Sequence, residues 1–143
     1  MQQISTFLMF TGQAEAALTL YTSVFANSRI LSLTRYGAGE DGAEGSVKHA
    51  TFSLNGQAFM AIDSNPVHAF TFTPSISLFV TCADETEIDR VYAALAEGGG
   101  VMMPLGAYPF ARKFAWIADR FGVSWQLSLP LNFDPSAAEP ITH

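Results

Sequence analysis

The chain has 143 residues, which fits one domain and is long enough to bury a hydrophobic core. Hydrophobic residues make up 49% of it and charged residues 14%, so it is too apolar for a disordered chain, and a partner chain is expected to cover part of its surface. The formal charge of −6, with 7 Lys and Arg, excludes the basic stripe that nucleic-acid binding requires.

Cysteine content and apolar runs bear on the compartment. The single cysteine, Cys82, cannot form an intrachain disulfide, and the first residues lack the basic and apolar pattern of a secretion signal. No apolar run approaches the roughly 18 residues that would indicate a membrane-spanning helix. These features predict a cytoplasmic protein that is not embedded in a membrane.

The chain begins with a predicted strand, helix and strand. Residues 4–10 are rich in β-forming side chains and stop at Thr11-Gly12. A helix is predicted next, because apolar residues recur at helical spacing until Asn27-Ser28: Ala14, Ala17, Leu18, Tyr21 and Phe25. Residues 29–36 then alternate as a strand does.

A glycine-rich loop and a hairpin complete the first half. Residues 37–45 hold four glycines and three acids, so this loop is expected to be exposed and mobile, and it is a candidate lid. Residues 47–54 and 57–62 flank Asn55-Gly56, whose residue types supply the positive φ angles of a type I′ turn. A connector with two prolines, residues 65–74, follows the hairpin.

The same order of elements starts again in the second half. A strand is predicted over residues 75–82 and a helix over residues 85–96, whose apolar face ends at the triple glycine 98–100. Residues 113–118 and 123–129 form a last hairpin around Phe121-Gly122, whose turn has either two or four residues.

Sliding the two halves over each other reveals a weak internal repeat. At a shift of 71 residues Tyr21 meets Tyr92, and at a shift of 66 Asn55-Gly56 meets Phe121-Gly122 and Met60 meets Gln126. The repeat predicts an α+β fold of two βαβββ modules. They form one domain over residues 1–129, with module one at 3–63, a linker at 64–74, module two at 75–129, and a C-terminal tail at 130–143.

Four segments carry a resemblance to a known family: residues 17–25, His49-Ala50, Phe59-Met60-Ala61, and the specific run 119–127. Over residues 3–129 the chain resembles the PhnB-like branch of the vicinal-oxygen-chelate superfamily, which includes glyoxalases, bleomycin-resistance proteins and dioxygenases. The resemblance implies that the two modules pair into a glyoxalase-like cupped sheet and that the protein is a homodimer. Some members are labelled demethylubiquinone methyltransferases, but this chain has no glycine-rich strand-to-helix turn for a nucleotide-like methyl donor.

The superfamily holds a divalent metal in the cup with His, Glu or Gln side chains from the first and last strand of each module. The resemblance places these positions at Ser5, Met60, Ser77 and Gln126. A thioether or a serine hydroxyl provides no charged donor, and one neutral amide oxygen is too few for such an ion. We therefore expect no metal and no other cofactor.

Strand alternation predicts which side chains face the cup. His49 pairs with Ile62 across the hairpin and shares a face with Thr51 and Met60, which makes it the candidate general base. The opposite face of residues 76–80 is expected to pack under a helix. The predicted ligand pocket is aromatic and mostly apolar and consists of Ser5, Phe7, Thr51, Met60, Ser77, Phe79, Trp116 and Gln126.

Other side chains have simpler structural interpretations. Asp63 is expected to face away from the cup and to cap the turn at Ser64-Asn65. His68 is expected to be solvated on the connector, and Tyr108 is either a packing corner, a dimer contact or a lid. Cys82 is expected to be an inert buried thiol.

Three functions remain open from the sequence. The first is metal-independent binding of a small, partly aromatic molecule in the cup. The second is a metal-independent enzyme in which His49 moves a proton while Gln126 or a serine hydroxyl stabilises negative charge. The third is a dimeric scaffold whose cup is filled by its own side chains.

Overall fold

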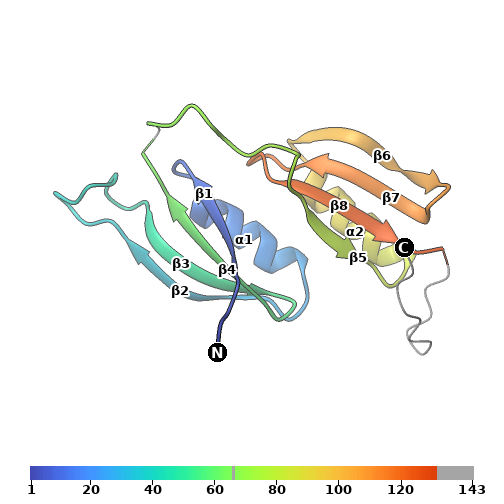
Figure 1. Cartoon of the computed structure of the whole chain (residues 1–143), viewed down its shortest axis with the longest axis horizontal. Helices are drawn as coiled ribbons and strands as arrows, with labels where there is room; N and C mark the ends of the chain where they lie inside the picture. Colours follow the sequence, from blue (N-terminus) through green and yellow to red (C-terminus); the bar gives the residue numbers. More distant parts are fainter. Residues whose placement is uncertain (66, 132–143) are drawn as a thin grey trace. The chain divides into compact units, whose positions relative to one another are not determined.

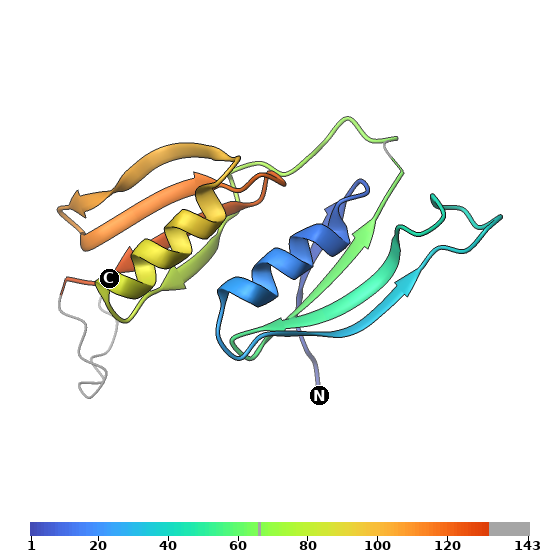
Figure 2. The ribbon, with the colours of Figure 1, turned by 180° about the vertical axis from the view of Figure 1, so that it is seen from behind.

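The computed structural model describes residues 1–65 and 67–131 and divides the chain into two compact units, Met1–Thr71 and Phe72–His143. In the described part, each unit contains one helix and one four-stranded sheet in the order βαβββ. Figures 1 and 2 show each helix lying along one face of its own sheet. The predicted α+β fold of two βαβββ modules is confirmed.

The sheet of the first unit has the strand order β1-β4-β3-β2, with β1 parallel to β4 and the other neighbours antiparallel. Its elements are β1 Thr6–Phe10, α1 Ala14–Val24, β2 Arg29–Arg35, β3 Val47–Leu54 and β4 Gln57–Asp63.

The second unit repeats this topology in the order β5-β8-β7-β6, with β5 parallel to β8. Its elements are β5 Leu78–Thr81, α2 Glu85–Ala96, β6 Gly100–Tyr108, β7 Ala111–Ala118 and β8 Ser124–Leu129. The predicted tail at 130–143 lies, beyond residue 131, outside the described residues.

Both helices are held by an apolar face that meets the sheet. The buried residues of α1 and α2 recur every three or four positions, which places them on one side of each helix: Ala14, Ala17, Leu18, Tyr21 and Val24 in α1, and Ile88, Val91 and Leu95 in α2. Asp84 caps α2, because its side chain accepts a hydrogen bond from Glu87 N at 2.8 Å. Phe25, expected inside the first helix, is its C-cap.

The first hairpin turns as predicted. Asn55 and Gly56 have φ angles of 48° and 84°, which are the two positive values of a type I′ turn. This turn fixes the register in which Thr51 lies opposite Met60.

The second hairpin corrects the prediction of a two- or four-residue turn. Asp119 N donates to Val123 O, Gly122 N donates to Asp119 O, and Gly122 has φ 93°, so the loop consists of residues 120–122. This is a tight turn followed by a glycine in a left-handed conformation, a common three-residue hairpin loop. The register that follows places Trp116 opposite Gln126.

The start of the second unit differs from expectation. The strand predicted over residues 75–82 is limited to Leu78–Thr81, and the Ile76 side chain is 72% exposed instead of lying under a helix. Ile76 precedes the strand, so it does not follow the strand's alternation. None of the described helices is long and apolar enough to cross a membrane.

Candidate functional site

Each sheet has one face covered by its helix and one face that we call the open face. On β3, the residues Ala50, Phe52 and Leu54 are buried against the helix side, whereas the alternate residues are only half-buried. This alternation of burial identifies the open face and decides which predicted pocket residues lie together.

Three predicted pocket residues lie side by side on the open face of the first unit. Phe7 on β1 lies opposite Met60 on β4, and Met60 lies opposite Thr51 on β3. The Phe7 side chain is 48% exposed although it is a large apolar group. Thr51 Oγ1 shares a hydrogen bond of 2.7 Å with Ser32 Oγ on β2, which fixes the orientation of its hydroxyl group.

His49 lies on the same open face, two residues from Thr51 on β3 and opposite Thr34 on β2. It is half-buried, and its ring has no hydrogen bond or ion pair with any residue in the described ranges. A histidine ring nitrogen without a protein partner is available to a bound molecule.

Ser5, another predicted pocket residue, precedes β1 and is half-buried.

The open face of the second unit carries a polar network next to an aromatic group. Trp116 Nε1 donates to Ser124 Oγ at 2.9 Å, Ser124 Oγ lies 2.6 Å from Ser77 Oγ, and Gln126 Nε2 donates to Ser77 Oγ at 3.4 Å. Phe79, which is 60% exposed, lies opposite Gln126 on the parallel neighbouring strand. Ser124 was not predicted, but it stands two residues before Gln126 and therefore shares its face.

The two open faces use equivalent positions. A half-exposed phenylalanine on the first strand, Phe7 or Phe79, lies opposite a residue of the last strand, Met60 or Gln126. Phe7 and Met60 in the first unit thus correspond to Phe79 and Gln126 in the second.

The residues at the four positions that the resemblance assigns to metal ligands do not fit a divalent metal. The side chains of Ser5, Met60, Ser77 and Gln126 offer hydroxyl, thioether and amide groups and no negative charge. Gln126 also uses its amide nitrogen toward Ser77. Within residues 1–65 and 67–131, no group of three or more His, Cys, Asp or Glu side chains is arranged to hold an ion.

Asp63 departs from its predicted role. Its carboxylate does not cap the turn at Ser64-Asn65. Oδ1 accepts from Gly12 N at 2.8 Å and from Ala14 N at 2.9 Å, and Oδ2 accepts from Val47 N at 2.9 Å. The buried side chain thereby joins the start of α1 to the start of β3. Three backbone donors satisfy a charge that burial would otherwise make costly.

Asp119 has a comparable place in the second unit. Its Oδ1 accepts from Phe121 N at 2.8 Å and Val123 N at 3.1 Å, and its Oδ2 accepts from Trp125 Nε1 at 2.9 Å. The side chain is buried, so it shapes the β7–β8 turn and is not exposed on the open face.

Cys82 and Tyr108 are placed in structural environments. Cys82 is fully buried, and this burial, reinforced by the charge of Glu87, raises the pKa of its thiol to about 12, so it stays protonated and unreactive. Tyr108 Oη donates to Pro104 O at 2.7 Å, and its ring packs against Phe110 and Phe114. The latter contacts form an aromatic corner at the β6–β7 turn.

His68 has protein contacts on the exposed connector. Its Nε2 lies 3.1 Å from Ser64 Oγ, and its ring stacks on Phe70 with centroids 4.6 Å apart. The prediction of a merely solvated side chain was therefore incomplete.

Comparisons with known proteins agree with this architecture. A family model described as 3-demethylubiquinone-9 3-methyltransferase matches residues 2–128. A solved structure from Bacillus cereus, titled a putative 3-demethylubiquinone-9 3-methyltransferase, PhnB protein, is 58% identical, with a TM-score of 0.88 over 90% of this chain and 99% of that chain. The search of curated proteins gave no match.

More distant structures share the fold. Protein PA1353 from Pseudomonas aeruginosa is 29% identical, with a TM-score of 0.79 over 91% of this chain and 98% of that chain. A glyoxylase/bleomycin resistance protein/dioxygenase domain from Frankia sp. EAN1pec is 14% identical, with a TM-score of 0.64 over 94% and 96% of the two chains. The chain belongs to the PhnB-like family whose model carries the 3-demethylubiquinone-9 3-methyltransferase description.

Proposed function

We propose that the protein binds a small, partly aromatic molecule on its open sheet faces without a divalent metal. The observation that carries the proposal is the pair of half-exposed phenylalanines, Phe7 and Phe79, at equivalent positions. Next to Phe79 lies the Ser77, Ser124 and Gln126 network, which offers oriented polar groups. Apolar surface with a few fixed polar groups is typical of small-molecule sites.

Metal independence rests on the donor set. Ser5, Met60, Ser77 and Gln126 cannot replace the hydration of a divalent ion with charged ligands. The binding energy would come instead from aromatic stacking, apolar burial and hydrogen bonds.

Binding is tested by thermal-shift screening of aromatic metabolites, with and without a chelator, followed by calorimetry of each hit. Phe79→Ala is expected to lower the affinity for a hit at least about tenfold, because stacking and apolar contact area are lost. Phe70→Ala is the matched control, since Phe70 is 66% exposed on the connector and lies outside the open faces. Equal binding by the Phe79 variant, or loss of binding when divalent ions are chelated, would refute the proposal.

Proton transfer by His49 is a second candidate function. It is favoured by the position of His49 on the open face and by the lack of a described partner for its ring. His49→Ala should abolish turnover of any substrate found while thermal unfolding stays unchanged; retained turnover would remove His49 from the mechanism.

Methyl transfer, the activity that the descriptions of these relatives name, has no recognisable site within residues 1–65 and 67–131. Each sheet is a four-stranded βαβββ unit and not a doubly wound parallel sheet with a glycine-rich phosphate turn. We therefore expect no binding of S-adenosylmethionine, and saturable binding in calorimetry would reverse this conclusion.

The location and assembly of the protein are part of the same proposal. We propose a cytoplasmic homodimer. A free, buried Cys82 suits a reducing compartment, and half-exposed side chains such as Phe7, Phe79 and Val101 suit a surface that a second copy partly covers.

A further inference from the structure

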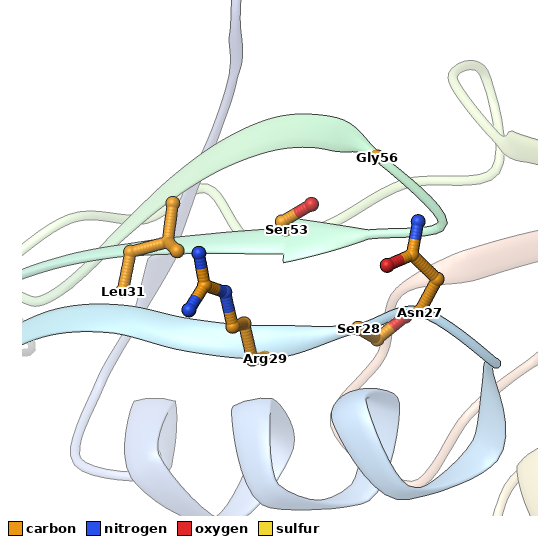
Figure 3. Close-up of a pocket in the computed structure, with 6 residues that line it drawn as sticks. All are labelled: Asn27, Ser28, Arg29, Leu31, Ser53 and Gly56. Atoms are coloured by element: carbon orange, nitrogen blue, oxygen red, sulfur yellow. The ribbon is translucent and has the colours of Figure 1, made fainter.

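A hollow lies within the first unit, at the end of the open face near the β3–β4 turn. Its volume is about 410 Å³, and it is lined by Asn27, Ser28, Arg29, Leu31, Ser53 and Gly56 (Figure 3). These residues come from the loop after α1, from β2, and from the β3–β4 hairpin. A volume of this size accommodates a small organic molecule.

The walls of this hollow are fixed by local contacts. Ser28 Oγ donates to Ala26 O at 3.1 Å and accepts from Asn55 N at 3.0 Å, which joins the α1–β2 loop to the hairpin turn. Asn27 has φ 53°, and its Nδ2 would lie 4.0 Å from a Cβ atom at Gly56. The loop and the turn are thus held close together.

A β-bulge arranges the remaining lining. Arg29 lies opposite Ser53, and the register shifts between Ile30 and Ser32, so Leu31 is the extra residue of β2. Bulges redirect side chains. Figure 3 shows the Arg29 guanidinium group beside Leu31, so a cation and an apolar surface are adjacent.

Arg29 differs from three cations of the chain that form ion pairs. Arg35 pairs with Glu15, Lys48 with Glu40, and Lys113 with Asp89. Arg29 has no ion pair or hydrogen bond with the side chains of the described residues, and it lines the hollow. The Asn27 amide and the Ser53 hydroxyl of the lining add further donors.

We propose that this pocket binds the carboxylate of a small organic acid, with the remainder of the acid against Leu31. The planar guanidinium group holds a carboxylate through two parallel hydrogen bonds. The chain's charge of −6 opposes such a ligand at long range, but physiological salt screens charges beyond roughly 8 Å. This inference goes beyond the proposed aromatic site, because it rests on other residues and names the ligand's charged group.

The test is an NMR titration of the full chain with sodium benzoate at constant ionic strength. Saturable shifts of amides around Arg29 and Ser53 are expected with a Kd of about 1 mM, since a partly exposed ion pair gives weak binding. Arg29→Gln should weaken binding at least about fivefold, and Arg29→Lys less, because lysine keeps the charge but loses the two-pronged geometry. Benzamide should bind at least about fivefold more weakly than benzoate.

One control separates this pocket from general charge effects. Arg112→Gln, at an exposed arginine of β7 in the other unit, should leave benzoate affinity unchanged. The inference is overturned by unchanged affinity in Arg29→Gln, by shifts centred elsewhere, or by no saturation up to about 20 mM. Tighter Arg29-dependent binding of inorganic phosphate would also overturn the carboxylate assignment.

Discussion

At the scale of single residues, two buried aspartates organise the chain. Asp63 and Asp119 each accept three hydrogen bonds from separate N–H groups within their own unit. Each bond also involves a charged acceptor, which makes it stronger than a bond between neutral groups. These carboxylates therefore stabilise the connections between elements and are not free for catalysis.

Asp63→Asn is expected to lower the free energy of unfolding by about 2–3 kcal/mol. The amide replaces one carboxylate oxygen with a donor that cannot accept from Gly12, Ala14 or Val47, so a buried N–H loses its partner. Urea denaturation measures the change. Asp41→Asn, at an exposed position of the 37–45 loop, is the control and should change stability by less than about 0.5 kcal/mol. Equal effects of the two substitutions would contradict the role of Asp63.

Cys82 predicts a loss of stability at alkaline pH. Its pKa is raised from the ordinary 9.0 to about 12 by burial, so between these values the unfolded thiol ionises while the folded thiol keeps its proton. The stabilisation is complete below pH 9 and is lost as the pH rises toward 12. Between pH 8 and 10 the free energy of unfolding should fall less in Cys82→Ala than in the parent chain, by on the order of 1 kcal/mol. Denaturation at each pH measures this difference. Parallel pH profiles of the two proteins would disprove this.

At the scale of elements, the turns determine which side chains share a face. The type I′ turn at Asn55-Gly56 pairs Thr51 with Met60, and the three-residue turn at residues 120–122 pairs Trp116 with Gln126. A one-residue change of either register would send these side chains to the helix side. The open faces therefore depend on turn geometry as much as on the strands.

Gly56→Ala is expected to cost about 1–2 kcal/mol of stability, because an L-residue is strained at φ 84°. Gly100→Ala provides a matched control, since its φ is not positive and a Cβ there would meet no atom within 4 Å. Chemical denaturation compares the two variants with the parent chain. A Gly56 variant as stable as the Gly100 variant would mean that the turn tolerates a side chain.

At the scale of the whole molecule, several large apolar side chains remain exposed. Large side chains including Phe7, Leu31, Phe79 and Val101 are about half exposed or more. Exposed apolar side chains lose contact with water when a ligand or a protein partner covers them. The proposed ligand and the proposed second copy are two ways to cover it.

Light scattering after size exclusion is expected to give twice the mass of one chain, which is 15.4 kDa. Burial of exposed apolar residues on association is the expected driving force, so high salt should not dissociate the dimer. A mass of one chain at micromolar concentration would contradict the homodimer.

Much of the fold was predictable from local sequence. The helix at residues 85–96 and the Asn55-Gly56 turn were both predicted, because helical periodicity and paired positive φ angles are local properties. The limits of β5 and the role of Asp63 were not, since they depend on contacts with distant segments. Ile76 looked like part of a strand, but none of the described strands pairs with it.

The sequence by itself determined the duplicated α+β architecture and carried the family resemblance, which assigns four uncharged residues to metal-ligand positions. The architecture follows from periodicity and the spacing of turns, which do not require distant contacts. Only the tertiary structure decided that Ser77, Ser124, Trp116 and Gln126 form one network and that Arg29 and Leu31 share a hollow. Parallel pairing, turn length and a β-bulge set those contacts, and each brings together residues that no local pattern relates.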